Sequence, residues 1–283
     1  MVEHVIKSFT ISDREFQLLS SLIYDLFGIV LTDKKKTLVI GRLQSELKKR
    51  GFNSFRQYYD FVLNDKSGQS LLTLIDKIST NHTFFFREAD HFEFFEKQAL
   101  PNIQSFLAQR NEKEIRIWCA GCSSGEEPYT LMMLVNEYFA SEKKDWNVKL
   151  LATDISTTAL EKAVAGIYKN ENIRNIPQTL LKKYFTKHDD DSWVVKDILK
   201  RNLFFKRLNL MQQNFPFKNN FHIIFCRNVM IYFDSKTRGE LIDKFSRFII
   251  PEGFLFIGHS ETIGRNNESF MYIKPALYQK KLA

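Results

Sequence analysis

An alternation of apolar strand-like runs and amphipathic helical segments begins at Glu114 and constrains the fold more than any other feature. Strands are expected at 115–119, 148–153, 203–208, 221–226 and 253–257, and helices at 128–139, 157–164 and 235–248. Such a series predicts an α/β fold, a mostly parallel, doubly wound sheet with helices on both faces. Residues 271–280 predict an antiparallel hairpin at the edge of that sheet.

The chain before this series has helical periodicity. Ser12 and Glu15 have the spacing of a capping box, and Gly28 should end the first helix. Further helices are expected at 32–50, 54–63 and 69–78, which together predict a small all-α domain. Many polar positions of the second helix are basic, which fits either a solvated face or a docking surface for an acidic partner. The candidate docking residues are Lys34, Lys35, Arg42, Lys48 and Lys49.

A long interruption at 168–201 separates the second and third expected strands. It contains a predicted helix at 177–184, an acid-rich turn at 188–191 and an extended run at 193–195. We expect a small β-hairpin subdomain at about 185–202, inserted into the main fold as either a structural flap or a functional element.

Composition narrows the class of protein. The 283 residues include 41 basic and 33 acidic side chains, and the net charge of +8 favours an anionic partner without identifying it. No apolar run is long enough to span a bilayer and no signal-peptide pattern is present, so we expect a cytoplasmic protein without membrane insertion. Cys119, Cys122 and Cys226 are too few for a disulfide framework. For the CxxC of the first two, small buried residues in a tight turn are favoured over a redox or metal role.

Side chains that come directly after the strands define the candidate site, because ligands of such sheets bind at the carboxyl ends of the strands. The first strand is followed by AGCSSGEEPY and the second by Asp154. Gly125 precedes Glu126 rather than a lysine, which argues against a triphosphate, and the glycine spacing matches a dinucleotide motif poorly. S-adenosylmethionine fits better. It lacks phosphate, its cationic groups can face Glu126 or Glu127, its ribose can donate to Asp154, and the glycines would let the backbone approach it closely.

Five stretches resemble the CheR family of chemotaxis receptor methyltransferases, and the resemblance covers essentially the whole chain. They are NHTFFFRE at 81–88, GCSSGEEPYT at 121–130, LATDIS at 151–156, FCRNVMIYF at 225–233 and GHSE at 258–261. The resemblance implies a class I S-adenosylmethionine-dependent methyltransferase with a Rossmann-like sheet, a helical N-terminal domain and an inserted β-subdomain. It also implies a protein-glutamate O-methyltransferase, which transfers methyl groups to glutamate side chains of chemoreceptors and releases S-adenosylhomocysteine.

The resemblance assigns roles to matched positions. Glu126 would contact the methionine portion of the cofactor, Asp154 the ribose, and Asn209 with Leu210 the adenine region. The full implied cofactor-binding set is Asn81, Thr83, Arg87, Gly121, Glu126, Asp154, Asn209, Leu210, Arg227 and Asn228. Arg87 and Tyr232 would be the catalytic residues, and no metal is expected.

The implied organisation is a receptor-recognition domain at 1–76, a linker at 77–95 that contributes to the active site, and a catalytic domain at 96–283. The partner would be the cytoplasmic domain of methyl-accepting chemoreceptors, met by the basic second helix. We expect a monomer that is recruited to receptor arrays and does not act on nucleic acid.

The expected chemistry is in-line transfer to a glutamate carboxylate, which is ionised at neutral pH and needs no general base. Arg87 would orient that carboxylate, with Tyr232 as a second donor or, alternatively, a core aromatic residue. Two other functions stay open. The basic composition suits a nucleic-acid methyltransferase, although RNVM stands where amino-methylating enzymes commonly carry an Asn/Asp-Pro-Pro-aromatic turn. The second open alternative is a module that binds S-adenosylmethionine without catalysing methyl transfer.

Overall fold

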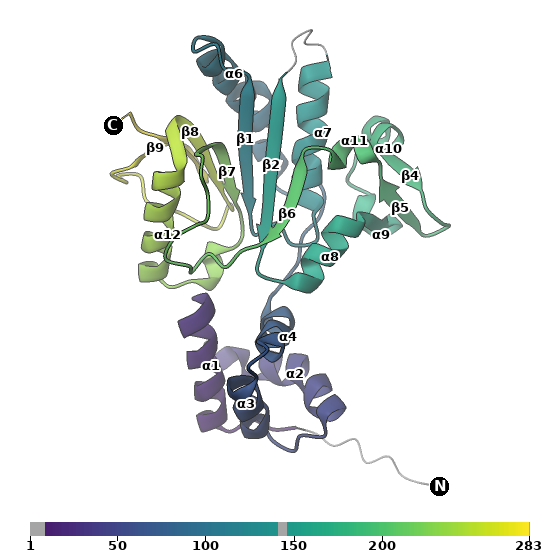
Figure 1. Cartoon of the computed structure of the whole chain (residues 1–283), viewed down its shortest axis with the longest axis vertical. Coiled ribbons are helices and arrows are strands. Elements are labelled where there is room, and N and C mark those ends of the chain that lie inside the picture. The colour runs from purple at the N-terminus through teal and green to yellow at the C-terminus, as the bar shows by residue number, and fades with distance from the viewer. Residues whose placement is uncertain (1–8, 141–145, 283) are drawn as a thin grey trace. The chain divides into compact units, whose positions relative to one another are not determined.

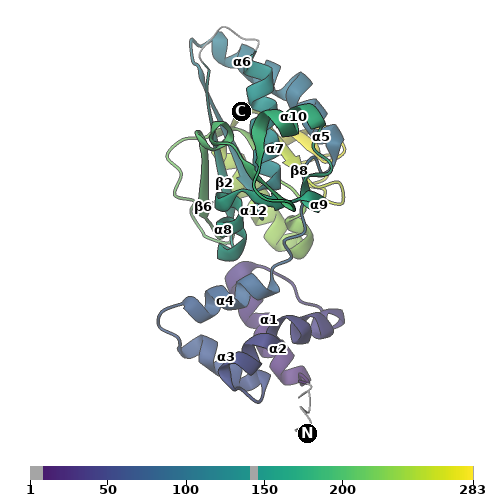
Figure 2. The ribbon, with the colours of Figure 1, turned by 90° about the vertical axis from the view of Figure 1, so that its right-hand side faces the viewer.

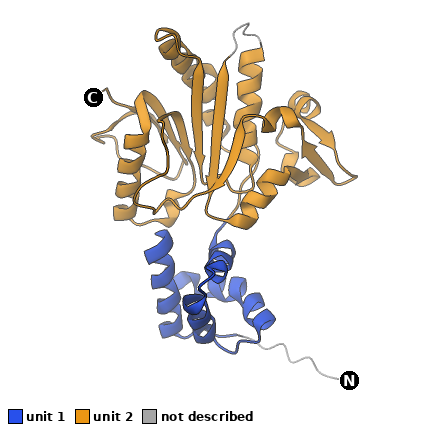
Figure 3. Cartoon of the chain, viewed as in Figure 1, with its two compact units in different colours: residues 1–80 blue, residues 81–283 orange. Residues whose placement is uncertain are grey.

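The structure, a computed structural model, describes residues 9–140 and 146–282. The chain divides into two compact units, residues 1–80 and residues 81–283 (Figure 3). None of the described helices is both long enough and apolar enough to cross a membrane.

From residue 9 onward, the described part of the first unit contains helices and no strand, as the sequence predicted. Its helices are α1 (Asp13–Phe27), the 3-10 turn η1 (Asp33–Lys35), α2 (Lys36–Arg50), α3 (Phe55–Asn64) and α4 (Gln69–Ile78). The capping box is present, since the Ser12 amide donates to the Glu15 carboxylate at 2.9 Å and Ser12 Oγ accepts from the Glu15 amide at 3.3 Å. Gly28 ends α1 in the left-handed conformation. The second helix begins later than expected, because the chain from Asp33 to Lys35 forms a 3-10 turn.

The second unit contains a seven-stranded sheet in the order β6-β2-β1-β7-β8-β10-β9 (Figure 1). Its strands are β1 (Glu114–Ala120), β2 (Asn147–Asp154), β6 (Leu203–Arg207), β7 (Phe221–Cys226), β8 (Ile249–Ile257), β9 (Phe270–Lys274) and β10 (Leu277–Lys280). The first five are parallel, and β10 runs antiparallel to both of its neighbours. Strand order reverses between β1 and β7, so their carboxyl ends form the switch point where such sheets bind ligands.

Helices cover both faces of this sheet (Figure 2). One core cluster packs Ile117 against α7 (Glu126–Ala140), α5 (Ala89–Phe94), the π-helical turn η2 (Phe95–Ala99) and α6 (Leu100–Ala108). Trp118 faces the other way, toward the core around α12 (Ser235–Phe248). Helix α8 (Thr157–Ala165) comes after β2. These features confirm the predicted doubly wound fold with an edge hairpin.

The insert is larger than the predicted hairpin. It contains β3 (Ile167–Lys169), α9 (Asn170–Ile173), α10 (Gln178–Tyr184), β4 (Phe185–Lys187), β5 (Ser192–Val195) and α11 (Asp197–Lys200). Its three strands form an antiparallel sheet in the order β3-β5-β4. The strand that the predicted hairpin lacked is β3, which pairs only three residues with β5. A run that short has no recognisable alternation of apolar and polar residues in the sequence.

Candidate active site

The glycine loop between β1 and α7 is shaped by packing within the protein. Gly121 has φ of +86°, and a Cβ there would lie 2.3 Å from Val229 Cγ2. Gly125 has φ of +97°, and its Cβ would lie 2.8 Å from the Tyr168 hydroxyl. Packing against Val229 and Tyr168 therefore already requires glycine at both positions. The expectation that they also let the backbone approach a ligand stays a prediction.

Asp154, at the end of β2, fixes two loops at the carboxyl ends of the strands. Its Oδ2 accepts from the Ser123 amide at 2.7 Å, and its Oδ1 accepts from the Ser156 amide at 2.9 Å. Ser123 belongs to the glycine loop, and Ser156 is the N-cap of α8. The carboxylate is therefore held in one orientation at the end of β2, beside the switch point, as a residue that recognises ribose would need to be.

Glu126 and Glu127, adjacent in sequence, have different environments. Glu127 accepts from Arg227 at 2.6 Å and from the Cys119 thiol at 3.0 Å, so it is already paired with a cation within the protein. Glu126 is buried, accepts from Ser124 Oγ at 2.7 Å, and has its pKa raised by that burial. Of the two carboxylates, only Glu126 remains a candidate for pairing with a cationic ligand group.

The cysteines are structural. Cys119, Cys122 and Cys226 are all free and buried. Burial raises the pKa of each thiol well above its usual range, so the reactive thiolate form is disfavoured. The buried-turn interpretation of the CxxC therefore has direct support.

The segment at 81–88 lies against the glycine loop and α7. The Asn81 carbonyl accepts from Ser123 Oγ at 3.2 Å, and Asn81 Nδ2 donates to Ser156 Oγ at 3.5 Å. The Phe86 amide donates to Thr130 Oγ1 at 3.4 Å. The 81–88 segment precedes β1 by more than twenty residues in the chain. These contacts bring it to the carboxyl ends of the strands, where Asp154 and Glu126 lie.

Arg87 and Thr83 are carried by this segment, and both side chains are half-buried. Arg87 Nη1 donates to the His82 carbonyl at 2.8 Å, and the guanidinium lies 5.8 Å from the centroid of the Phe84 ring. One bond to its own segment leaves other guanidinium donors for a carboxylate.

Arg227 has contacts that its predicted place in the cofactor wall does not explain. Its side chain is 1% exposed and donates to Glu88 Oε2 at 3.0 Å, to Glu127 Oε2 at 2.6 Å, and to the Arg87 carbonyl. Both terminal nitrogens are thus engaged within the protein, whereas Nε is buried and has no hydrogen-bond partner among the described residues. Arg227 therefore supports the 81–88 segment, and its contact with the cofactor stays a prediction.

Glu261, in the GHSE stretch after β8, organises the loop after β7 but was not included in the predicted set of site residues. Its carboxylate is buried and accepts from the amides of Asn228 at 3.0 Å, Ile231 at 3.1 Å and Gly258 at 2.5 Å. Tyr232 directly follows Ile231 in the 3-10 turn η3 (Met230–Tyr232), and its side chain is half-buried. The signal was available, because Glu261 comes after a strand as Asp154 does.

Asn209 and Leu210 come after β6 at the same edge. The preceding Leu208 amide donates to the Asp154 carbonyl at 3.0 Å, which ties this loop to β2. Asn209 Oδ1 accepts from the Met211 amide at 3.0 Å, and the Leu210 carbonyl accepts from Lys244 Nζ at 2.6 Å. The Leu210 side chain is buried in the core around α12, and its contact with an adenine ring stays a prediction.

Glu88, His91 and His259 offer donor atoms that all lie within 4.8 Å of one another, close enough to consider a metal site. Glu88 Oε2 already accepts from Arg227 at 3.0 Å and from the His259 amide at 3.2 Å. A cation at this oxygen would also lie beside the buried guanidinium. These contacts favour a hydrogen-bonded cluster over a metal centre.

The predicted docking residues of the first unit fall into two groups. Lys34, Lys48 and Lys49 are exposed and Lys35 is half-buried. Arg42 instead donates to the Ile78 carbonyl and joins α2 to the end of α4, with further bonds to Ser79 and Thr80 at 3.0 Å. Its guanidinium is occupied within the unit, so we withdraw Arg42 from the docking set.

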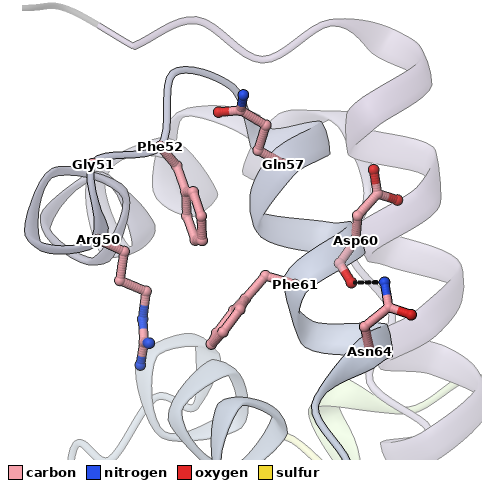
Figure 4. A pocket seen from close by; sticks show the side chains of 7 residues that line it. All are labelled: Arg50, Gly51, Phe52, Gln57, Asp60, Phe61 and Asn64. Carbon is pink, nitrogen blue, oxygen red and sulfur yellow. Dashed lines mark hydrogen bonds between the residues drawn. The ribbon is translucent and has the colours of Figure 1, made fainter.

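The end of α2 also borders an open pocket of about 510 Å³ that extends to α3 (Figure 4). Phe52 and Phe61 form its apolar part, and the Arg50 guanidinium lies 4.5 Å from the centroid of the Phe61 ring. Arg50, which lines the pocket, directly follows Lys48 and Lys49 in the chain.

The strand order, the antiparallel β10 and the loop after β1 define a class I S-adenosylmethionine-dependent methyltransferase. A family model described as "CheR methyltransferase, SAM binding domain" matches residues 81–278, and one described as "CheR methyltransferase, all-alpha domain" matches residues 14–79. The chain belongs to the CheR methyltransferase family. S-adenosylmethionine is its cofactor, which confirms that prediction.

Similar proteins carry chemotaxis names. The chain is 48% identical over 270 residues to "Chemotaxis protein methyltransferase" of Borreliella burgdorferi, covering 95% of each. It is 35% identical over 263 residues to the Escherichia coli protein of the same name, covering 92% of this chain and 88% of that one. Among solved structures, an rRNA methylase from Streptococcus thermophilus is 13% identical, covers 66% of this chain and 98% of that chain, and gives a TM-score of 0.35.

Proposed function

We propose that this protein methylates glutamate side chains of chemoreceptor cytoplasmic domains, forming glutamate methyl esters. The observation that carries the proposal is the attachment of the 81–88 segment to the glycine loop, which brings Arg87 to the edge that holds Asp154 and Glu126. The relatives' names, chemotaxis protein methyltransferase, supply the biological setting.

The residues at this edge fit the cofactor. Glu126 would pair with its ammonium, Asp154 would accept from its ribose, and Asn209 with Leu210 would meet its adenine. Asn81, Thr83, Gly121 and Asn228 complete the proposed lining. Bound S-adenosylmethionine would supply an electrophilic methyl group.

The chain's own residues would then position the acceptor. A glutamate carboxylate is ionised at neutral pH, so the site needs donors rather than a base. Arg87 is suited to this task because a guanidinium can bind both carboxylate oxygens at once. Tyr232 would be a second donor, and exclusion of water would strengthen both contacts.

The helical domain at 1–76 would recognise the receptor. The exposed Lys34, Lys48 and Lys49, with Lys35, would attract acidic receptor surfaces through charge. The linker at 77–95 and the catalytic domain at 96–283 would complete a monomeric enzyme that is recruited to receptor arrays in the cytoplasm.

Replacement of Arg87 tests this assignment. Arg87→Ala should lower kcat for a receptor fragment by about 100-fold, while the dissociation constant for S-adenosylhomocysteine changes by less than about 3-fold. Arg201→Ala, at an exposed arginine of the insert, is the matched control and should leave both values unchanged. An equal loss of turnover and cofactor affinity would assign Arg87 to cofactor binding, and unchanged turnover would remove it from the mechanism.

A further inference from the structure

Glu88 has a backbone conformation that needs an explanation. Its φ is 58° and its ψ is 65°, in the left-handed region that costs a residue with a side chain free energy. It occupies the N-cap position of α5, yet its side chain makes no capping hydrogen bond. The strained backbone instead points the carboxylate toward the ends of the central strands.

Three donors from those strand ends meet this carboxylate. Arg227 Nη2 donates to Oε2 at 3.0 Å, Asn228 Nδ2 donates to Oε1 at 3.2 Å, and the His259 amide donates to Oε2 at 3.2 Å. Arg227 and Asn228 come after β7, and His259 comes after β8. Burial alone would raise the pKa of Glu88, but Arg227 and Asn228 outweigh it and hold the pKa below its usual value.

Arg227 extends the contacts to α7 and to Arg87. It donates to Glu127 at 2.6 Å in the first turn of α7, and its Nη2 donates to the main-chain carbonyl of Arg87 as well as to Glu88. The main chain that carries the Arg87 side chain is therefore held on its carboxyl side by a Glu88–Arg227–Glu127 triad with a buried guanidinium at its centre.

We propose that Glu88 is a positioning residue for methyl transfer: through this triad it fixes the main chain of Arg87, so that the guanidinium meets the acceptor carboxylate in a single place. The inference rests on the proposed function, because it assumes that Arg87 orients the acceptor. In this role Glu88 acts through Arg227 and the Arg87 main chain, and its own carboxylate accepts from protein donors.

A double-mutant cycle tests the coupling. Glu88→Gln should lower kcat by about 100-fold and change the dissociation constant for S-adenosylhomocysteine by less than about 3-fold. In the Arg87→Ala background the same change should lower kcat by less than about 3-fold further, because a positioning residue has nothing left to position. Glu93→Gln is the matched control, since Glu93 is an exposed glutamate that pairs with Lys97 on its own helical stretch. Additive losses in the cycle, or an unchanged kcat for Glu88→Gln, would overturn the proposal.

A second readout does not depend on activity. Amide hydrogen exchange over residues 81–88 should be faster in Glu88→Gln than in wild type or Glu93→Gln, in the presence of saturating S-adenosylhomocysteine. Glu88→Asp, which keeps the charge, should exchange at an intermediate rate and serves if Glu88→Gln does not fold. Unchanged exchange in this segment would overturn the triad as a positioning device. If wild type transfers no methyl to receptor fragments, the proposed function fails while this measurement still decides the role of Glu88.

Discussion

Removal of the Arg227 guanidinium should destabilise the catalytic unit strongly. The arginine side chain is 1% exposed, and Glu88 and Glu127 are each 13% exposed, so solvent screens these charges little. Arg227→Met leaves two largely buried carboxylates without their shared cation and the Arg87 carbonyl without a donor. Breaking a buried ion pair by removing one partner costs about 3–5 kcal/mol, and we expect a loss in that range.

Urea unfolding followed by tryptophan fluorescence measures this loss. The three tryptophans, Trp118, Trp146 and Trp193, all belong to the unit at 81–283, so the signal reports that unit alone. Arg227→Lys, which retains the charge but cannot bridge three acceptors in the same way, should lose less stability than Arg227→Met.

A triple variant separates the charge from the packing. Glu88→Gln, Arg227→Met and Glu127→Gln together bury no formal charge, and this variant should recover to within about 2 kcal/mol of wild type. If Arg227→Met alone lies within about 1 kcal/mol of wild type, the triad does not stabilise the unit as reasoned. If the triple variant is less stable than Arg227→Met, unpaired charge is not the cause.

Two further predictions concern the glycine loop and pH. Gly121→Ala should lower stability by more than about 1 kcal/mol and weaken cofactor binding, because a Cβ would lie 2.3 Å from Val229 Cγ2 at a φ of +86°; calorimetry should show partial recovery when Val229→Ala is added. Burial, followed by the nearby Arg116, lowers the pKa of His222 to about 4 although Glu114 acts in the opposite direction. Between pH 6.5 and pH 4 the imidazole is protonated in the unfolded chain but still neutral in the folded protein. The free energy of unfolding therefore decreases as the pH falls through this range. Between pH 7 and pH 5 the wild type should lose about 2 kcal/mol more than His222→Gln, and equal losses in urea titrations would contradict this.

The sequence predicted the sheet well because each central strand is an apolar run between turns. The helices α8 and α12 were predicted to within a residue, with caps at Ser156 and Asp234 that accept from the amides three residues later. In contrast, the helical stretch from Ala89 to Ala108 was not predicted. It contains the π-helical turn at Phe95–Ala99, which shifts the phase of a 3.6-residue pattern in a phenylalanine-rich segment.

The site was predicted in part, for a different reason. Asp154, Glu126 and the 227–228 pair could be identified from their positions just after predicted strands, because parallel strands end at one edge. The sequence could not predict which charges pair, since Glu88 and Arg227 are 139 residues apart and their contact depends on the path of the 81–88 segment. The sequence therefore contained no sign that Arg227 supports the 81–88 segment through its terminal nitrogens.

The most direct test of the proposed function is incubation with methyl-labelled S-adenosylmethionine and a receptor cytoplasmic fragment, followed by release of the label as methanol with base. Glutamate methyl esters are base-labile, so we expect released label with the wild-type fragment and none when its acceptor glutamates are replaced by glutamine. Cofactor binding without base-labile label, or label that persists in the glutamine fragment, would contradict glutamate methylation.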